Sequence, residues 1–398
     1  MRNSIFPEWE PRSNSWLFSF SWEQRKLGDI ADRYDNLRVP VAASERLAGN
    51  TPYYGANGIQ DYVHGYTHDG EFILVAEDGA NDLKNYPVQF VRGKIWVNNH
   101  AHVLQGKTQV ASTLFLKYAV ARTNIEPFLV GGGRAKLNAE TMMAIGVNHP
   151  KKMSEQQKIG AFFESLDRLI TLHQRKYDKL TKVKKSMLEK MFPKNGSNVP
   201  EIRFSGFSDA WEQRKLEMLA SFSKGAGYSK NDLLSSGTPI ILYGRLYTKY
   251  ETNITIVDTF VAAKSGSIYS RGGEVIVPAS GETAEDISIA AVVENKGVIL
   301  GGDLNIITPG KDLDPTFLAL TISFGNAHKE LSRFAQGKSV VHLHNADLKI
   351  ADISYPKCKE QQKIGAFFQT LDRLITLHQR ELDRLQKIKK SCLEKMFV

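Results

Sequence analysis

The sequence predicts an α+β fold with two mixed α/β globular units, separated by two long antiparallel coiled-coil helices, and a pseudo-two-fold internal repeat. Three observations support this prediction. The segment EQQKIGAFF occurs at 155–163 and again at 360–368, and WEQRKL occurs at 22–27 and again at 211–216. The residues around EQQKIGAFF follow a 3.5-residue apolar period, which is typical of coiled-coil helices. Short β-branched runs between Gly, Asn and Asp clusters precede each helix and indicate strands.

The length of the chain and its cysteine content limit the class of protein. At 398 residues the chain exceeds one ordinary domain of about 150 residues, so two or three domains are expected. The two cysteines, Cys358 and Cys392, give no disulfide framework of the kind that small secreted proteins carry. No apolar run approaches the roughly 18 residues of a membrane span. We therefore expect a cytoplasmic protein that contacts no membrane.

The repeats divide the chain into a unit, a helix, a second unit and a second helix. WEQRKL opens each unit, and Pro150 and Pro356 lie just before the helices, where proline often marks a helix start. The segment PKNGSNVPEIRFSGFSDA is rich in Pro, Gly, Ser and Asn and is predicted to be a linker. The expected boundaries are a leader at 1–21, the first unit at 22–150, a helix at 151–192, the linker at 193–210, the second unit at 211–356 and a helix at 357–398.

The two units are related to each other but have diverged. ILVAEDGAN at 73–81 resembles VIVPASGET at 275–283, and VNNHAHVL at 97–104 takes the place of LGGDLNII at 300–307. These matches predict a shared fold with different surface residues. A repeat that keeps its helices and changes its units indicates one constant partner and two different targets.

The two helices are near copies of each other. Of the 38 residues at 155–192, 30 are identical at 360–397, and each helix is expected to be about 57 Å long. Matching seams favour packing of the helices on each other, and antiparallel packing suits two halves related by a two-fold axis. Two seam positions are polar, His173 and His378, and we interpret them as residues that fix the register. The predicted seam consists of Ile159, Phe163, Leu166, Ile170, His173, Tyr177, Leu180 and Met187 in the first helix, and Ile364, Phe368, Leu371, Ile375, His378, Leu382, Leu385 and Cys392 in the second.

Positive charge is concentrated in the helices rather than in the units. The net charge is +9, but residues 22–150 carry 13 basic and 13 acidic groups, and residues 211–357 carry 15 and 16. Residues 151–194 carry 12 basic against 5 acidic groups, and residues 358–398 carry 9 against 5, which gives +7 and +4. If the units bind DNA, they must do so through locally polarised surfaces.

Two variable units, each followed by a near-identical helix that begins with EQQKIG, resemble the specificity subunit of a type I restriction-modification system. The resemblance covers nearly the whole chain and includes YYGANGIQDYV at 53–63, AEDGAN and VNNHAHVL, together with GGRAKLNAETM and QGKSVVHLHNADLK before the helices. One departure is the leader, where WLFSFSW at 16–22 is a shortened counterpart of RFSGFSDAW at 203–211.

This resemblance implies a complete set of roles and partners. The units would be target recognition domains that read the two parts of a split sequence in double-stranded DNA, and the helices would be spacers that hold two methyltransferase subunits. Restriction and motor subunits would complete the complex. The chain itself would be non-catalytic and would bind no cofactor, since S-adenosylmethionine, ATP and Mg belong to the partner subunits.

Motifs that would make the chain an enzyme are missing from the sequence. GKS at 337–339 lacks the earlier glycine of a phosphate loop, and GGG at 131–133 opens no GxGxxG unit. No Asn-Pro-Pro-aromatic segment, the usual adenine methyltransferase signature, occurs. His100 and His102 are two residues apart, on one face of a strand, and a zinc site would need further ligands. We favour a structural or DNA-facing role for them and expect no metal.

Side chains that can hold phosphates or reach base edges are the candidates for DNA contact. In the first unit they are Tyr53, Tyr54, Asn57, Arg92, Lys94, Asn98, Asn99, His100, His102, Arg134 and Lys136. In the second unit they are Tyr228, Ser229, Lys230, Tyr243, Arg245, Tyr247, Lys249, Arg271, Lys338 and Ser339.

Two other kinds of function stay open at this point. The near-neutral units also suit a coiled-coil scaffold with no role on DNA, and a self-contained methyltransferase or nuclease is the second alternative. Neither the DNA sequence nor the length of its gap follows from the amino-acid pattern, because readout depends on loop geometry.

Overall fold

The computed structural model describes residues 22–131, 135–194, 196–335, 337 and 340–397. The chain forms two compact units. Unit 1 runs to Leu172 and also includes the chain from Leu382 onward, and unit 2 is His173–Glu381. Each unit therefore contains a globular part and a piece of both long helices.

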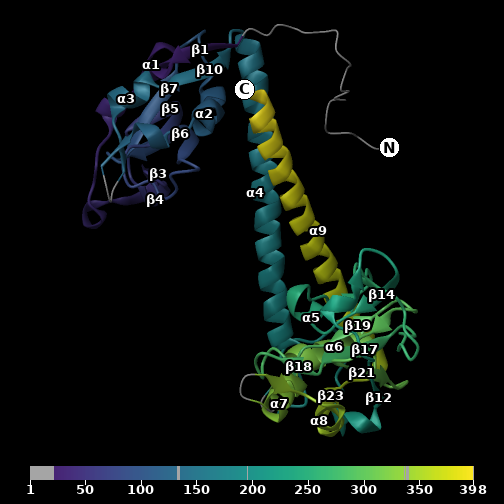
Figure 1. Cartoon of the computed structure of the whole chain (residues 1–398). Coiled ribbons are helices and arrows are strands. Elements are labelled where there is room, and N and C mark those ends of the chain that lie inside the picture. The colour runs from purple at the N-terminus through teal and green to yellow at the C-terminus, as the bar shows by residue number, and fades with distance from the viewer. Residues whose placement is uncertain (1–21, 132–134, 195, 336, 338–339, 398) are drawn as a thin grey trace, which may run out of the picture. The chain divides into compact units, whose positions relative to one another are not determined.

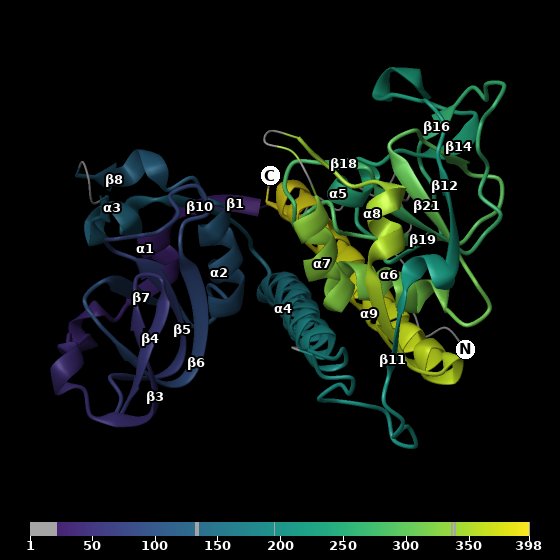
Figure 2. The same ribbon diagram turned by 90° about the horizontal axis from the view of Figure 1, so that it is seen from below.

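Unit 1 contains a six-stranded sheet in the order β2-β7-β5-β6-β3-β4 (Figure 1). Helix α2 packs against β5 and β6 of this sheet, as Figure 2 also shows. The elements are β1 Trp22–Lys26, α1 Leu27–Ile30, β2 Ala31–Arg33, β3 Ala48–Gly55, β4 Gly58–Val63, β5 His68–Ala76, β6 Val88–Val97, β7 Ala101–Gly106, α2 Thr113–Arg122, β8 Leu129–Val130, β9 Lys136–Leu137, α3 Ala139–Ala144, β10 Gly146–Pro150 and α4 Met153–Lys190, with short 3₁₀ turns η1 Asp35–Leu37, η2 Ala43–Glu45 and η3 Glu126–Phe128.

The central strand β5 is buried on both faces. Ile73 and Val75 belong to one core, which includes α2 and the start of α4. Phe72 and Leu74 point the other way into a second core. Successive side chains of a strand alternate between faces, so the continuous apolar run of β5 fills both cores.

Unit 2 contains a five-stranded sheet in the order β12-β21-β17-β19-β15 and a four-stranded sheet in the order β13-β16-β14-β20. The elements are β11 Glu212–Lys215, β12 Ala220–Lys224, β13 Leu233–Leu234, β14 Thr238–Ile241, α5 Arg245–Thr248, β15 Asn253–Ile254, β16 Phe260–Val261, β17 Glu274–Pro278, β18 Ser280–Gly281, β19 Ala291–Val293, β20 Ile299–Leu300, β21 Leu304–Pro309, α6 Pro315–Phe324, α7 Asn326–Phe334, β22 Val341–His342, α8 Asn345–Ile350, β23 Asp352–Tyr355 and α9 Cys358–Met396, with 3₁₀ turns η4 Leu216–Met218 and η5 Lys230–Asp232.

The strand pairs that the sequence comparison matched occupy equivalent places in the two units. In unit 1, β5 pairs antiparallel with β7, and Val75 lies opposite His102. In unit 2, β17 pairs antiparallel with β21, and Val277 lies opposite Asn305. The prediction of a shared α+β fold with an internal repeat is confirmed.

The repeated WEQRK segments close each unit just before its helix. Strand β1 pairs with β10, so Trp22 lies opposite Pro150. Strand β11 pairs in the same way with β23, so Glu212 lies opposite Tyr355. Each helix therefore leaves its globular part from a strand that the start of that part holds in place.

Helices α4 and α9 pack antiparallel, as the sequence predicts. In unit 1 the ring of Phe163, early in α4, lies 5.9 Å from that of Phe397, just after α9. In unit 2 the ring of Phe368, early in α9, lies 6.4 Å from that of Phe192, just after α4. The same contact is thus made twice by residues that are 205 positions apart.

The predicted seam residues are all buried or half-buried. Those near the start of each helix also pack into the globular part, and the rings of Phe163 and Tyr118 lie 5.1 Å apart. Ile159, Phe163, Leu166, Ile364, Phe368, Leu371, Leu382 and Leu385 are buried, while Ile170, His173, Tyr177, Leu180, Met187, Ile375, His378 and Cys392 are half-buried.

The first glutamine of EQQKIG holds each helix to its own globular part. Gln156 is fully buried. Its Oε1 accepts from the backbone N–H of Ser112 at 2.8 Å, and its Nε2 donates to the carbonyl oxygens of Val110 and Pro150 at 3.1 and 2.9 Å. Ser112 is the N-cap of α2.

Gln361 makes the same three bonds in unit 2. Its Oε1 accepts from the N–H of Asp314, the N-cap of α6, at 2.8 Å. Its Nε2 donates to the carbonyl oxygens of Asp312 and Pro356 at 2.9 and 2.8 Å. Part of the repeat therefore faces inward, so a constant external partner is not its only explanation.

Two further sequence-based expectations can be compared with the structure. Cys358 and Cys392 are both free thiols. No helix in the described part of the chain combines the length and apolar character that crossing a membrane requires.

Candidate nucleic-acid interface

Several of the predicted DNA-contact residues of unit 1 come together at a group of loops. The Nδ2 of Asn57, in the β3–β4 turn, donates to the carbonyl of Gly79 at 2.9 Å, in the loop after β5. His100, in the turn between β6 and β7, hydrogen-bonds the Asp78 carboxylate through Nδ1. Asp78 also forms a β-bridge with Lys136. We define loop cluster 1 as Asn57, Asp78, Asn99, His100 and Lys136.

Loop cluster 1 has the side chains that direct reading of DNA requires. Asn57, Asn99 and Lys136 are exposed, and His100 is half-buried. Asparagine amides and histidine rings both donate and accept hydrogen bonds, as contact with base edges demands. The ammonium group of Lys136 lies 3.0 Å from Glu77 and is a candidate for a phosphate contact.

Arg92 and Lys94 lie earlier on β6 and are exposed. The Arg92 guanidinium pairs with Glu71 at 2.9 Å and with Glu164 of α4 at 3.2 Å. The Lys94 ammonium lies 4.7 Å above the ring of Tyr66, a half-exposed tyrosine that the sequence analysis missed. Both cations remain open to a phosphate because their partners are exposed as well.

Three of the predicted contact residues are buried, which corrects the expectation for them. Tyr53, Asn98 and His102 are 1%, 3% and 1% exposed. The Tyr53 hydroxyl accepts from the N–H of Val41 at 3.0 Å, and the Asn98 Oδ1 accepts from the N–H of His100 at 2.8 Å. Tyr54 is half-buried against the second core of unit 1, and burial raises the pKa of its hydroxyl.

His102 has a structural role, and its counterpart in unit 2 has the same one. The His102 Nε2 bonds the carbonyl of Leu137 at 2.9 Å. At the equivalent place on β21, the Nδ2 of the buried Asn305 donates to the carbonyl of Leu343 at 2.8 Å. Leu137 and Leu343 each precede the short helix before β10 or β23. Two different polar residues thus hold the same segment.

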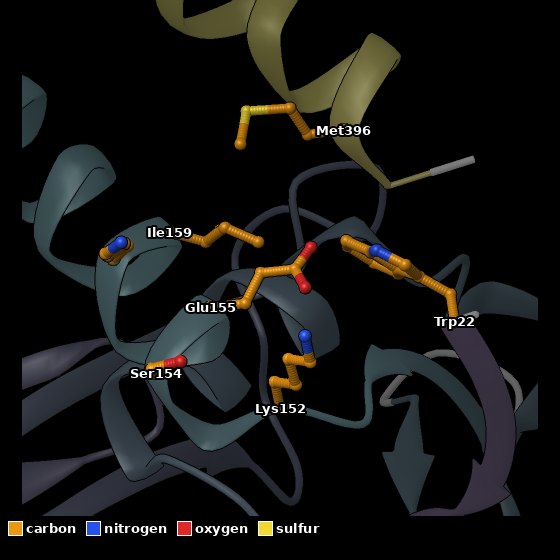
Figure 3. A pocket seen from close by; sticks show the side chains of 7 residues that line it. Trp22, Lys152, Ser154, Glu155, Ile159 and Met396 are labelled. Atoms are coloured by element: carbon orange, nitrogen blue, oxygen red, sulfur yellow. The ribbon is translucent and has the colours of Figure 1, made fainter. Parts of the chain in front are cut away.

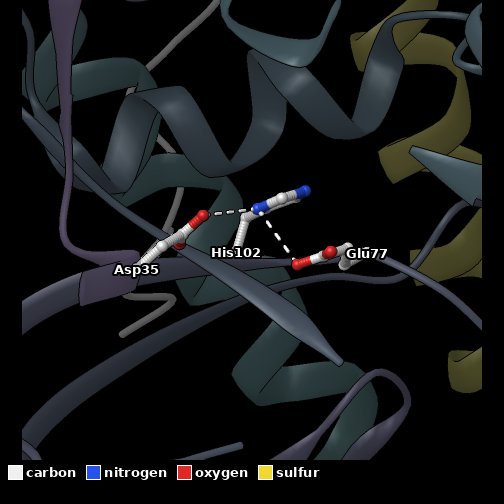
Figure 4. A group of neighbouring side chains, drawn as sticks. All are labelled: Asp35, Glu77 and His102. Atoms are coloured by element: carbon white, nitrogen blue, oxygen red, sulfur yellow. Dashed lines mark hydrogen bonds and ion pairs between the residues drawn. The ribbon is translucent and has the colours of Figure 1, made fainter. Parts of the chain in front are cut away.

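His102 also lies in a buried ionic cluster with Asp35 and Glu77 (Figure 4). Its Nδ1 lies 2.7 Å from Asp35 and 3.6 Å from Glu77. The guanidinium of Arg38 lies 2.7 Å from Glu77 and 3.6 Å from Asp35. These three carboxylate and imidazole groups could in principle hold a cation, but Arg38 and Lys136 already supply positive charge to the carboxylates.

The pKa values of both carboxylates reflect this arrangement. Burial raises the pKa of Asp35, but the hydrogen bond and charge of His102 outweigh it and leave the pKa below its usual value. Burial likewise raises the pKa of Glu77, and the bonds from Arg38 and Lys136 lower it overall. Both groups are therefore held as carboxylates, and the cluster fixes η1 against β7.

Unit 2 has a loop group at the equivalent place with different side chains. The Tyr247 hydroxyl donates to the carbonyl of Ser280 at 2.9 Å, and the Ser280 Oγ lies 3.2 Å from the Nδ1 of His342. The rings of His342 and His344 stack with centroids 6.1 Å apart, and those of Tyr243 and Tyr247 meet edge to face at 6.3 Å. We define loop cluster 2 as Tyr243, Tyr247, Ser280, His342 and His344.

The sequence analysis missed three members of loop cluster 2. Ser280 pairs with His342 between β18 and β22, which matches the Asp78–Lys136 bridge of unit 1. His342 and His344 are exposed, whereas Leu343 between them is buried. The alternation in HLH is the signal that could have found them, since it places both histidines on one face of a strand.

Two further candidates of unit 2 have structural roles. The Arg245 side chain is 8% exposed and donates to Asp258, Glu251 and the carbonyl of Ile256 at 2.7, 2.8 and 2.8 Å. Ser229 caps η5 and shares a capping box with Asp232. These bonds occupy the Arg245 side chain, which corrects the expectation that it contacts DNA. Ser229 is exposed, and its DNA contact stays a prediction.

The remaining candidates of unit 2 lie nearer the surface. Tyr228 is half-buried, and its hydroxyl accepts from the N–H of Lys264 at 2.8 Å, while the Lys264 ammonium lies 4.7 Å above its ring. Lys230 and Arg271 are exposed, and the exposed Lys249 pairs with Asp258 at 2.7 Å. Arg134, Lys338 and Ser339 lie outside the described residues.

Comparison with known proteins gives consistent results. The family model of the type I restriction modification DNA specificity domain matches residues 21–182 and again 208–387. A Haemophilus influenzae protein described as a type I restriction enzyme specificity subunit is 32% identical over 374 residues, which are 89% of each chain. The MjaVIII specificity subunit of Methanocaldococcus jannaschii is 21% identical over 94% of this chain and 91% of its own.

A solved structure shares the fold. The crystal structure of the S subunit of a type I restriction-modification system from M. genitalium covers 97% of this chain and 98% of its own, with a TM-score of 0.67 and 13% identity. The two segments that the family model matches each contain one globular part and most of the helix that follows it.

Proposed function

Because this chain belongs to the family of type I restriction-modification specificity subunits, we propose that its two recognition domains read the two halves of a split DNA target. Loop cluster 1 reads one half, and loop cluster 2 reads the other. The observation that supports this most is that equivalent loops of one shared fold present different hydrogen-bonding side chains. Different donors and acceptors select different base pairs.

The two clusters differ in the chemistry that they offer to DNA. Loop cluster 1 presents two asparagine amides and a lysine, and amides suit adenine edges. Loop cluster 2 presents tyrosine and histidine rings, which offer single hydrogen bonds and flat apolar surfaces. The exposed cations Lys94, Lys230 and Arg271 supply phosphate contacts, which position the domains without reading sequence.

The helices, in this proposal, set the gap between the two half-sites and hold two methyltransferase subunits. Since Gln156 and Gln361 face inward, the docking surface consists of the identical residues that stay exposed. These include Arg168 and its copy Arg373, and Lys185 and its copy Lys390. A surface present in both helices provides two equivalent docking sites, and restriction and motor subunits join this core.

Catalysis belongs to the partner subunits in this proposal. The chain binds no cofactor, and S-adenosylmethionine, ATP and Mg are used by the methyltransferase and motor subunits. Incubation of DNA and S-adenosylmethionine with this chain alone should give no methylation, and addition of the methyltransferase subunit should give it. Methylation by the isolated chain would contradict this assignment.

Substitutions in loop cluster 1 test the reading of DNA. In the complex with the methyltransferase subunit, Asn99→Ala should weaken selection at one or two base pairs of one half-site only. The expected loss is about 1–3 kcal/mol of discrimination, or roughly 5- to 150-fold. Asn124→Ala is the matched control, because Asn124 is an exposed asparagine on the loop after α2 and should change nothing. Equal selectivity of both variants and the parent protein would refute the assignment of this cluster.

A further inference from the structure

A cavity of about 510 Å³ lies at the start of α4 in unit 1 (Figure 3). Its wall is mixed, with three apolar side chains and three charged ones. Figure 3 shows Glu155 and Lys152 directed toward the open space between Ile159, Met396 and Trp22. Its lining includes Trp22, Lys152, Glu155, Lys158, Ile159 and Met396.

The equivalent surface of unit 2 is covered by the segment before β11. The 205-residue repeat makes Glu360 the copy of Glu155 and Lys363 the copy of Lys158. The Arg203 guanidinium donates to both oxygens of Glu360, at 2.6 and 2.7 Å. The Lys363 ammonium lies 5.0 Å from the ring centre of Phe207.

Further contacts fix this covering segment, 202–209, along its length. The Lys357 ammonium, a copy of Lys152, pairs with Asp209 at 2.6 Å. The ring of Phe204 meets that of Phe367 edge to face at 5.9 Å. Ile202 and Phe204 pack against the main core of unit 2. The sequence interpretation of 193–210 as a linker is therefore incomplete, because half of it forms part of the folded unit.

Among the described residues of unit 1, Glu155 lacks the ion pair that its copy Glu360 forms in unit 2. Glu360 is 1% exposed and fully paired, whereas Glu155 is half-buried and has no ion-pair partner in the part of the chain that the structure describes. A carboxylate beside an apolar cavity favours a cationic and apolar ligand, because burial of the carboxylate is tolerated when it is paired.

We propose that the leader of this chain, residues 12–21, occupies this cavity as residues 202–209 occupy its copy in unit 2. The leader ends at Ser21, next to Trp22 of the cavity wall. In the alignment of WLFSFSW with RFSGFSDAW, Phe18 and Phe20 correspond to Phe204 and Phe207. The two aromatic rings fill the apolar part, against Ile159 and Met396.

The side chain of Arg12 fills the charged part of the cavity and pairs with Glu155. The position that corresponds to Arg203 is Leu17, which has no charge. The arginine that pairs with Glu155 is therefore Arg12, which lies earlier in the leader. Ser21 lies nine positions after Arg12, and an extended chain of that length spans up to about 30 Å, which is ample for Arg12 to reach Glu155. The stretch from Leu17 to Trp22 is three residues shorter than Arg203–Trp211 and contains no aspartate. Lys152 therefore lacks the partner that Asp209 provides for its copy Lys357.

Chemical cross-linking tests this occupant directly and does not depend on the DNA-reading proposal. In the full chain with Cys358→Ser and Cys392→Ser, the pair Phe20→Cys and Lys158→Cys should be joined within one chain by a short bifunctional maleimide. The matched control is Phe207→Cys with Lys363→Cys, whose side chains meet in the structure. A control that cross-links while the Phe20 pair does not would overturn the proposal. Cross-links only between chains would assign the cavity to the leader of a second copy and would also overturn it.

Hydrogen exchange gives an independent readout without new cysteines. Phe18→Ser with Phe20→Ser should increase amide exchange in residues 152–159 by at least about fivefold, because an uncovered helix start opens more often. Exchange in residues 357–364 should stay unchanged. Phe204→Ser with Phe207→Ser should increase exchange in residues 357–364 and leave exchange in residues 152–159 unchanged. Unchanged exchange at 152–159 in the leader variant, or protection there only after the methyltransferase subunit is added, would refute the proposal.

Discussion

His173 of α4 and His378 of α9 face each other with their Nδ1 atoms 3.1 Å apart and their rings edge to face. They are the same residue of the two repeats, since 205 positions separate them. A residue that meets its own copy marks the two-fold axis of the helix pair. Lys184 pairs with Asp372, and Lys389, the copy of Lys184, pairs with Asp167. The pair is therefore isologous, as in a symmetric dimer.

Replacement of Gln156 should destabilise unit 1. Gln156→Ala removes three hydrogen bonds and leaves one buried N–H and two carbonyl oxygens with fewer partners. The expected cost is about 2–3 kcal/mol of unfolding free energy, which lowers the melting temperature by roughly 4–10 °C. The control is Gln157→Ala, because Gln157 is exposed and should cost less than about 0.5 kcal/mol. Equal losses in the two variants, measured by urea unfolding, would contradict the role given to Gln156.

Mild acid should weaken the helix pair through its central histidines. Burial and the positive charges of His173 and Lys176 lower the pKa of His378 below its ordinary 6.5. The folded state then binds fewer protons than the unfolded state as pH falls through 6.5, so stability falls with it and levels off below the folded pKa. Asp35 and Glu77 also have lowered pKa values and lose their stabilising effect only near or below pH 4.5.

The melting temperature should therefore fall between pH 7.5 and pH 5.5. His173→Leu with His378→Leu should remove this part of the drop in melting temperature. The contribution of His68, whose pKa burial also lowers, should remain. An identical drop in the variant and the parent chain, by calorimetry, would show that the histidine pair does not titrate in this range.

A fragment of residues 1–194 should form a symmetric dimer. Helix α4 contains both members of each reciprocal contact, so His173 can meet His173 and Lys184 can meet Asp167 of a second copy. In this dimer a second copy of α4 takes the place of α9, so Lys176 stands where α9 has Glu381. Two +7 helices repel each other more than a +7 and a +4 helix. Association should therefore be weaker than within the chain and should improve with salt. A monomer at roughly tens of micromolar in sedimentation experiments would mean that the halves are not interchangeable.

Removal of one heptad from each helix should shorten the gap in the DNA target. Deletion of 174–180 and 379–385 keeps the phase of the seam and the aromatic and glutamine contacts at both helix starts, while His173 comes to face Leu371 and His378 comes to face Leu166. The spacer loses about 10 Å, which corresponds to about 3 base pairs at 3.4 Å each. Mapping of the methylated site in the complex measures the change. A shortened protein that still methylates DNA with the original gap would show that another element sets the spacing.

The helices and the repeat could be predicted from the sequence because their signals are periodic. The expected helices at 151–192 and 357–398 correspond to Met153–Lys190 and Cys358–Met396. The apolar run ILVA at 73–76 likewise indicated a strand, and in the structure its side chains fill two cores. In these cases the type of each residue indicates the environment of its own position.

Individual site residues were less predictable because their roles depend on distant partners. His100 and His102 look alike in sequence, but only His102 lies beneath Leu137 and beside Asp35. Gln156 is one of two adjacent glutamines, and only the loop before α2 gives it three bonds. Phe204 was assigned to a linker because its neighbours are Gly and Ser, while its contact with Phe367 comes from the other end of the domain.

In the proposed function, each recognition domain reads its half of the target alone. The most direct measurement is a methylation map of DNA from cells that carry either this chain or a chimera in which residues 22–150 come from a relative. We expect the chimera to change one half of the recognised sequence, to keep the other half and the gap, and to retain adenine methylation. A chimera that changes both halves together would contradict independent reading, because the two domains would then read DNA as one surface.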